Sequence, residues 1–232
     1  MIFVSKNKLR IDWATHESAK YACENWHYLK KIGFGKNNKI GVWENNKFIG
    51  AIIFGYSATP NVAKKYSLKQ NEIVELQRVA LRQHKSEVSR MISLAIKFLK
   101  KKNPKLKLII SFADCDRNHH GGIYQAGNWI YTGISMKDQK SGYIVRNKYM
   151  HCRSAGMKGR NTLEWVRKNL DSNAVEFITK GKHSYLMPLN EEMRQRILPL
   201  SKPYPKRTKS GDDGDHPYSD GATPIRTLQA VA

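Results

Sequence analysis

Side chains that can transfer protons or bind metals follow directly after an apolar run in the middle of the chain. Residues 106–113 form a short, β-branched apolar run, which predicts a buried strand. The GGIYQAGNW segment further on predicts a short helix over residues 122–126 that ends at Gly127. Ligands bind at the carboxyl ends of strands in open α/β sheets, so we expect the site here. Between the strand and the helix lie Asp114, Cys115, Asp116, Asn118, His119 and His120.

The net charge of the chain indicates a polyanionic partner. Its 232 residues include 41 Lys and Arg but only 19 Asp and Glu, a net charge of +22. A protein that neutralises phosphates gains affinity by releasing condensed counterions, which favours nucleic acid. A solvated basic surface without a partner is the alternative interpretation.

Neither a membrane span nor a signal peptide is expected. No run approaches the roughly 18 apolar residues that a spanning helix needs. The apolar residues 1–4 are followed at once by Lys6, Lys8 and Arg10, which is atypical of a signal peptide. Three cysteines, Cys23, Cys115 and Cys152, lack metal-type spacing, so we expect free thiols in a reducing cytoplasm.

The elements that position these residues are predicted from hydrophobic periodicity and turn signals. Asn45 and Asn46 suit a tight turn between two strands. The unit of strand, long helix and strand over residues 72–113 predicts a parallel strand pair. Ser86 is the candidate cap of the long helix. We expect one domain over residues 1–200 and a disordered tail over 201–232. Further expected elements are a helix over 15–26, strands over 129–135 and 142–150, a helix over 162–170, and a terminal hairpin of 175–178 with 185–187.

This order of elements resembles the GNAT acyltransferase fold, an α/β (α+β) fold with a mixed central sheet flanked by helices. The segment IYQAGNWIYTG is similar to the tyrosine-bearing helix and following strand of that superfamily. The resemblance places Tyr124 where a general acid protonates the leaving group, a step suited to a phenol. Packing of Tyr124 in the core is the alternative.

The resemblance also implies a glycine-rich pyrophosphate turn between Leu81 and Met91. The stretch RQHKSEVSR has no glycine there. Helix amides could still hold an anion, with Ser86, Ser89 and His84 as the candidate cofactor-binding residues. The acyl-type donor is therefore unidentified, and standard acetyl-CoA is not the expected one.

A narrower resemblance, to the phage Mom family of DNA-modification proteins, covers residues 23–185. It is carried by several motifs in order: CENWHYLK, GVWE, ELQRVAL, SEVSRMI, SFAD, HHGGIYQAGNWIYTG and KYMHCR. Asn118 stands where we expect a glycine. The resemblance implies an enzyme in the cytoplasm of an infected bacterium that converts adenine in double-stranded DNA to N(6)-carbamoylmethyladenine and so protects phage DNA from restriction. It implies site roles for His27, Tyr28, Asp114, His119, His120 and Tyr124.

The chemistry of adenine modification suits these residues. The adenine amino group is a poor nucleophile, so Asp114 or His27 is expected to take its proton or to hydrogen-bond the base edge. The alternative is a metal site, because His27, His119 or His120, and Asp114 supply the two-histidine, one-carboxylate set of non-haem iron. A member of the family has been associated with iron.

A base inside a duplex must be flipped out before it can react. Four aromatic residues, Trp26, Tyr28, Trp129 and Tyr131, are candidates to replace the lost stacking, although each could equally belong to the core. Phosphate contacts are expected from basic residues late in the fold, namely Arg146, Lys148, Arg153, Lys158 and Arg160.

Two other functions remain open. One is a GNAT-type N-acyltransferase that uses an acyl-CoA on protein or RNA. The other is a basic DNA-binding protein on a fold that has lost catalysis. A homodimer is possible in each case.

Overall fold

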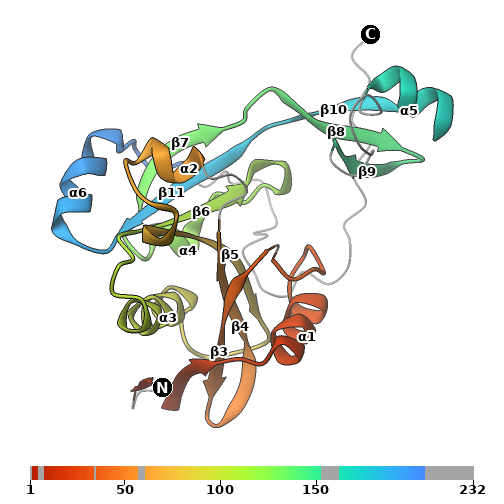
Figure 1. Cartoon of the computed structure of the whole chain (residues 1–232). Helices are drawn as coiled ribbons and strands as arrows, with labels where there is room; N and C mark the ends of the chain where they lie inside the picture. Colours follow the sequence, from red (N-terminus) through yellow and green to blue (C-terminus); the bar gives the residue numbers. More distant parts are fainter. Residues whose placement is uncertain (1, 5–7, 34, 57–60, 153–161, 207–232) are drawn as a thin grey trace.

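The computed structural model describes residues 2–4, 8–33, 35–56, 61–152 and 162–206 (Figure 1). A mixed eight-stranded sheet forms the body, in the order β1-β2-β3-β4-β5-β6-β11-β7. A second sheet of three strands, in the order β10-β8-β9, projects from one end of it (Figure 1). The mixed central sheet flanked by helices confirms the predicted fold class. The strands are β1 (Ile2–Val4), β2 (Leu9–Trp13), β3 (Asn37–Glu44), β4 (Lys47–Gly55), β5 (Ile73–Leu81), β6 (Leu108–Asp114), β7 (Ile130–Ser135), β8 (Gln139–Val145), β9 (Lys148–His151), β10 (Val175–Thr179) and β11 (Lys182–Pro188).

Helices cover both faces of the large sheet. One face packs against α3, and the opposite face packs against α1, α2 and α6 through two separate apolar clusters. No helix among the described residues is long and apolar enough to span a membrane. The helices are α1 (His16–Trp26), α2 (Asn61–Lys65), α3 (Val88–Lys102), α4 (Gly122–Gln125), α5 (Leu163–Asn169) and α6 (Glu191–Ile197), with 3-10 turns η2 (Gln70–Glu72), η3 (Cys115–Arg117) and η5 (Leu198–Leu200).

Local signals predicted the first half of the chain well. Thr15 caps α1 by accepting a hydrogen bond from the Ser18 amide. The β3–β4 hairpin turns at Asn45 and Asn46, whose φ angles of 51° and 63° are ones that asparagine tolerates. β5 and β6 pair in parallel, with α3 between them in sequence, as predicted.

Two predictions about the second half are wrong. Residues 142–150 do not form one strand: they turn at Arg146 and Asn147, which both have positive φ, so that β8 and β9 form a hairpin. The expected terminal hairpin is also absent, because β10 pairs with β8 while β11 inserts between β6 and β7. Gly181, at φ +89°, lies between β10 and β11, where the chain passes from one sheet to the other.

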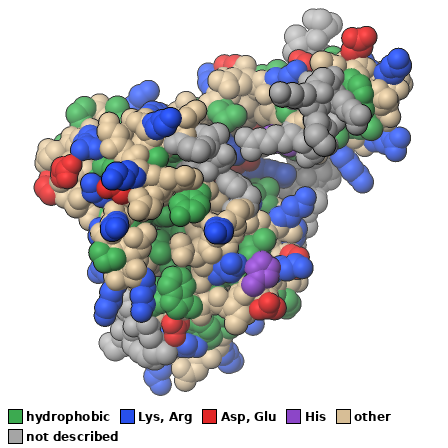
Figure 2. All heavy atoms as spheres, in the orientation of Figure 1, with side chains coloured by type: hydrophobic (Ala, Val, Ile, Leu, Met, Phe, Trp, Pro, Cys, Tyr) green, Lys and Arg blue, Asp and Glu red, His purple; other side chains and the backbone are tan. Residues whose placement is uncertain are grey.

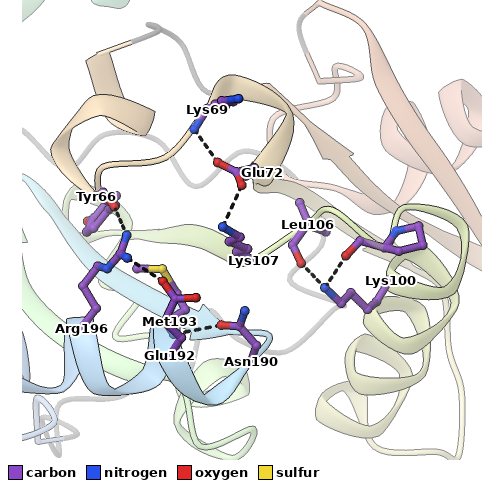
Figure 3. Close-up of polar contacts among 11 residues, drawn as sticks. Tyr66, Lys69, Glu72, Lys100, Leu106, Lys107, Asn190, Glu192, Met193 and Arg196 are labelled. Carbon is purple, nitrogen blue, oxygen red and sulfur yellow. Dashed lines mark hydrogen bonds and ion pairs between the residues drawn. The ribbon is translucent and has the colours of Figure 1, made fainter.

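The amino ends of β5 and β6 are held together by charged contacts (Figure 3). The Glu72 carboxylate accepts hydrogen bonds from the Lys69 amide at 2.7 Å and from Lys107 Nζ at 2.9 Å. Glu72 precedes β5 and Lys107 precedes β6, so the ion pair fixes the start of both strands. In the same region Arg196 of α6 donates to the Tyr66 carbonyl at 3.2 Å. The carboxyl halves of β5 and β6, in contrast, do not pair with each other.

Part of the expected disordered tail lies against the sheet. The Lys202 amide donates to the Tyr131 carbonyl at 2.8 Å, and the Tyr204 hydroxyl donates to the Trp129 carbonyl at 2.7 Å. Residues 202–204 thus lie along the outer edge of β7. The rest of the expected tail, 207–232, lies outside the described residues.

Candidate functional site

β5 and β6 stop pairing halfway along their length. Ladder pairs join them only from Ile73 and Leu108 to Glu75 and Ile110, although β5 continues to Leu81 and β6 to Asp114. Two parallel strands that diverge expose backbone groups that need other partners. We call this gap between the carboxyl halves of the two strands the β5–β6 gap.

Hydroxyl groups fill the gap from the α3 face of the sheet. The Ser111 hydroxyl donates to the Leu76 carbonyl across the gap at 2.9 Å. The Tyr124 hydroxyl lies 2.7 Å from that of Ser111. The ring of Tyr124 is 7% exposed and packs against Trp129 and Tyr185, with ring centroids 5.1 Å away in each case. Tyr124 therefore has its ring packed in the core and its hydroxyl at the gap.

The end of α1 delivers two aromatic side chains to the other face. His27 is the C-cap of α1 and stacks on Tyr28, with centroids 4.5 Å apart. Tyr28 in turn contacts His119 edge-on at 5.0 Å, and the Arg117 guanidinium lies 5.9 Å from its ring. The WHY segment and the loop after β6, about 90 residues apart in sequence, thus lie in contact.

His27 is a hydrogen-bond donor rather than a base in this arrangement. Burial, and then the positive charge of Arg78, lowers the pKa of His27 to about 3, so the imidazole is neutral at neutral pH. Its Nδ1 accepts a hydrogen bond from the Leu29 amide at 3.1 Å. A neutral imidazole that accepts at Nδ1 carries its proton on Nε2. Nε2–H can therefore donate to a substrate oxygen or ring nitrogen.

Tyr28 keeps its proton at neutral pH. Burial of the hydroxyl and the nearby Asp114 carboxylate raise the pKa of Tyr28 to about 12. Even so, 44% of the side chain is exposed. Of the four aromatic candidates for stacking, Tyr28 is the exposed one: Trp26 packs against Phe48, and Trp129 and Tyr131 are 1% and 7% exposed.

A cavity of about 250 Å³ lies at the outer edge of β7, between Trp129, Tyr131 and residues 201–204. Strand β11 separates β7 from β6, so this cavity is apart from the β5–β6 gap.

Three charged residues that the sequence analysis did not assign to the site lie on this face. A bulge in β5 at Gln77 shifts the register so that Glu75 and Arg78 share a face. Lys182 pairs with Asp114 across β11 and β6, so their side chains also share a face. Burial raises the pKa of Glu75 to about 7, although Lys182 and Arg78 act in the opposite direction. The sequence did show charged residues, Glu75 and Arg78, within an apolar strand, which could have marked them as site residues. It did not show the bulge that places both on one face.

Asp114 ends β6 and begins the turn η3. Its Oδ1 accepts a hydrogen bond from the Asp116 amide at 3.0 Å, which leaves Oδ2 for other partners. Asp116 has a structural role, since its carboxylate accepts hydrogen bonds from the Thr179 hydroxyl and the Lys180 amide. Asn118 adopts the left-handed conformation at φ 57°, which asparagine tolerates in place of glycine. Asn118 therefore adopts a backbone conformation that a glycine would also allow.

His119 and His120 face different partners. His119 contacts Tyr28. His120 instead lies near His183: burial lowers the pKa of His183, and the charge of His120 lowers it further. The His120 carbonyl accepts hydrogen bonds from Gln125 Nε2 and from the Tyr185 hydroxyl. Within the described part of the chain, no three His, Cys, Asp or Glu side chains are grouped as a metal site. The predicted set of His27, His119, His120 and Asp114 is thus not assembled as metal ligands there.

The turn before α3 does not have the predicted arrangement. Ser86 is not the cap of α3: Glu87 occupies the N-cap position, and the Ser86 hydroxyl donates to Glu44 Oε1 at 2.6 Å. Ser89 lies in the first turn of α3. Both ring nitrogens of His84 are buried without a hydrogen-bond partner among the described residues.

Two of the five predicted DNA-binding residues are described. Arg146 and Lys148 are exposed at the tip of the β8–β9 hairpin, in the sheet that projects from the body. Arg146 is anchored there, because its amide donates to Asp171 Oδ2 at 2.6 Å. Figure 2 shows Lys and Arg side chains on this projection as well as on the body. Arg153, Lys158 and Arg160 lie outside the described residues.

The chain is similar to one protein family, to a phage protein and to several solved structures. A model of the Mom protein family matches residues 8–206. The chain is 24% identical over 208 residues to methylcarbamoylase mom of Escherichia phage Mu, covering 86% of this chain and 84% of that protein. Among solved structures, a probable acetyltransferase from Staphylococcus epidermidis is similar with a TM-score of 0.44 and 8% identity, over 78% of this chain and 99% of that one. An acetyltransferase from Bacillus subtilis in complex with CoA has a TM-score of 0.42 and 13% identity, over 79% and 100%.

Proposed function

Because the chain belongs to the Mom protein family, we propose that it is a DNA-modifying transferase that converts adenine in double-stranded DNA to N(6)-carbamoylmethyladenine. Such a change to phage DNA would protect it from restriction in the infected host. The observation that carries the proposal is the family match over residues 8–206, which includes the motif residues that meet at the β5–β6 gap. The relative from phage Mu is itself a methylcarbamoylase.

Asp114 is the proposed proton acceptor. The adenine amino nitrogen has a delocalised lone pair, so it attacks efficiently only if its proton is removed as the new bond forms. In the proposed step the N6–carbon bond forms, the N6 proton passes to the Asp114 carboxylate, and the bond between carbon and the leaving group breaks. Lys182 and Arg78 supply positive charge on the same face of the sheet.

Tyr124 is the proposed proton donor to the leaving group. Its hydroxyl reaches the β5–β6 gap from the face opposite Asp114, next to Ser111. Beyond Glu75 and Ile110 the two strands no longer pair, so side chains rather than backbone hydrogen bonds separate the two faces there. Adenine would thus enter on the Asp114 side and the donor on the Tyr124 side, so that the leaving group receives its proton away from the base.

Tyr28 is the proposed stacking partner of the flipped adenine. A base taken out of the duplex needs a new π surface, and the half-exposed ring of Tyr28 lies beside His119 and near Asp114. The Nε2–H of His27 would hydrogen-bond the base edge or the incoming group. Backbone phosphates would be contacted by Arg146 and Lys148 on the projecting sheet.

The test is expression in a bacterium followed by digestion of its DNA and nucleoside mass spectrometry. The proposal predicts a deoxyadenosine derivative that carries a carbamoylmethyl group and is absent when the vector is empty. Finding unmodified deoxyadenosine alone, with folded protein present in the cells, would contradict it. Transfer of an acetyl group to protein or RNA from acetyl-CoA would favour the N-acyltransferase alternative.

A further inference from the structure

Glu44, the last residue of β3, is bonded to the turn that leads into α3. Its carboxylate accepts three hydrogen bonds, from the Lys85 amide at 2.9 Å, from the Ser86 amide at 2.8 Å and from the Ser86 hydroxyl at 2.6 Å. Glu44 is 7% exposed and Ser86 is 4% exposed. A buried carboxylate with three charge-assisted hydrogen bonds is firmly held.

The surroundings keep Glu44 ionised. Burial acts to raise the pKa of Glu44, but the hydrogen bonds from Ser86 and Lys85 outweigh burial and hold the pKa below its ordinary value. His84 lies near enough to act in the same direction. The turn therefore contains a permanent negative charge at neutral pH.

That charge occupies a position suited to a phosphate. Successive backbone amides just before a helix N-terminus bind anions, and the helix dipole adds to the attraction. α3 has 15 residues, and its N-cap residue Glu87 makes no side-chain capping hydrogen bond. The anion that uses the Lys85 and Ser86 amides is instead Glu44.

We propose that Glu44 closes the turn before α3 as a built-in anion, so that the protein does not hold the diphosphate of coenzyme A at this turn. The residues present do not fit a diphosphate there, since two of the amide donors and the Ser86 hydroxyl are already bonded and the site is buried. A diphosphate would also meet the like charge of Glu44. This inference rests on the proposed function, because it concerns the donor in that transfer: the donor is anchored elsewhere or carries no nucleoside diphosphate.

Purified full-length protein without DNA provides the test, so its outcome does not depend on whether adenine is modified. Glu44→Ala removes the built-in anion, and Glu44→Gln keeps one oxygen acceptor without the charge. Glu87→Ala is the matched control, because it removes a neighbouring acid that makes no capping bond. Thermal unfolding is followed with and without inorganic pyrophosphate at constant ionic strength, and binding of coenzyme A is measured by calorimetry.

The proposal predicts that pyrophosphate raises the unfolding temperature of Glu44→Ala and leaves the wild type and Glu87→Ala unchanged. It also predicts coenzyme A binding at least roughly tenfold tighter in Glu44→Ala than in the wild type, because a like charge has been removed. If Glu44→Ala does not fold, the same comparison is made with Glu44→Gln. Saturable binding by the wild type that neither variant improves, or a folded variant with no response to pyrophosphate, would overturn the proposal.

Discussion

The hydroxyl groups of Ser111 and Tyr124 lie 2.7 Å apart in the gap where β5 and β6 have ceased to pair. Ser111 also bridges the gap to the Leu76 carbonyl. A tyrosine with a buried ring and a hydroxyl at this point is rigidly positioned, which is what proton delivery to a leaving group requires. The contact explains why a side chain in the core is nevertheless a candidate for chemistry.

Tyr124→Phe is expected to separate chemistry from stability. The variant keeps the ring contacts with Trp129 and Tyr185 and loses the hydrogen bond with Ser111, so the free energy of unfolding should fall by about 1 kcal/mol. The modification rate should fall by about 100-fold or more, the usual effect of losing a general acid. Single-turnover modification of a DNA duplex and urea unfolding provide the two measurements.

Ser111→Ala serves as the control for this prediction. It leaves the Leu76 carbonyl without its side-chain donor, so stability should fall by about 1–3 kcal/mol while the Tyr124 hydroxyl remains. If Ser111→Ala lost as much modification activity as Tyr124→Phe, the Tyr124 hydroxyl would not be acting on its own.

Glu75→Gln is expected to change how stability depends on pH. The folded-state pKa of Glu75 is about 7 against an ordinary value of 4.5, so the folded protein holds this proton more tightly than the unfolded chain. The stability that this group contributes is complete below pH 4.5 and is lost as pH rises to about 7. The wild type should lose up to about 3 kcal/mol relative to Glu75→Gln over this range.

Urea unfolding at a series of pH values measures that difference. Glu164→Gln, at an exposed position on α5, is the control and should show no comparable dependence on pH. Stability curves for wild type and Glu75→Gln that stay parallel between pH 4.5 and 7 would show that Glu75 has an ordinary pKa.

Charge reversal at the tip of the projecting sheet should weaken DNA binding. Arg146→Glu combined with Lys148→Glu removes two proposed phosphate contacts, which should flatten the slope of log affinity against log salt by roughly 1.8. Lys101→Glu with Lys102→Glu, at the exposed end of α3, makes the same charge change elsewhere. An equal effect of the two pairs would mean that net charge alone, rather than the β8–β9 hairpin, determines binding.

Tyr28→Ala should impair base flipping while Tyr28→Phe preserves it. The phenylalanine ring can still stack on an extruded base, an interaction that contributes about 1–3 kcal/mol. Fluorescence of 2-aminopurine placed at the target adenine reports extrusion. Equal fluorescence with all three proteins would remove Tyr28 from the binding of the flipped base.

The sequence predicted most elements whose signals are local, although the expected Ser86 cap of α3 was wrong. The Asn45–Asn46 turn, the Thr15 cap and the periodicity of α3 each depend on neighbouring residues, and each prediction is confirmed. The insertion of β11 between β6 and β7 is a non-local pairing, which no local pattern encodes. The β8–β9 turn was missed because Arg146 and Asn147 lie between residues that continue the strand pattern.

The same distinction applies to the site. The family resemblance named Tyr28 and His119 as site residues, but only the structure shows that they are in contact. Glu75 and Arg78 lie on the same face of the sheet only because of a one-residue bulge in β5. Lys182 lies on that face because it pairs with Asp114. The proton on His27 Nε2 likewise follows from a single hydrogen bond, which the Leu29 amide donates to Nδ1. Such details are set by tertiary structure and are not visible in the residue types.

Parallel nucleoside analysis of wild type and Asp114→Asn tests the central claim most directly. Asparagine retains an oxygen that can accept the Asp116 amide hydrogen bond, so the fold should persist, while the proton acceptor for the adenine amino group is lost. The account predicts carbamoylmethylated deoxyadenosine in DNA from cells that express the wild type. It predicts at least about 100-fold less from cells with equal amounts of folded Asp114→Asn. Equal modification by both proteins would contradict it.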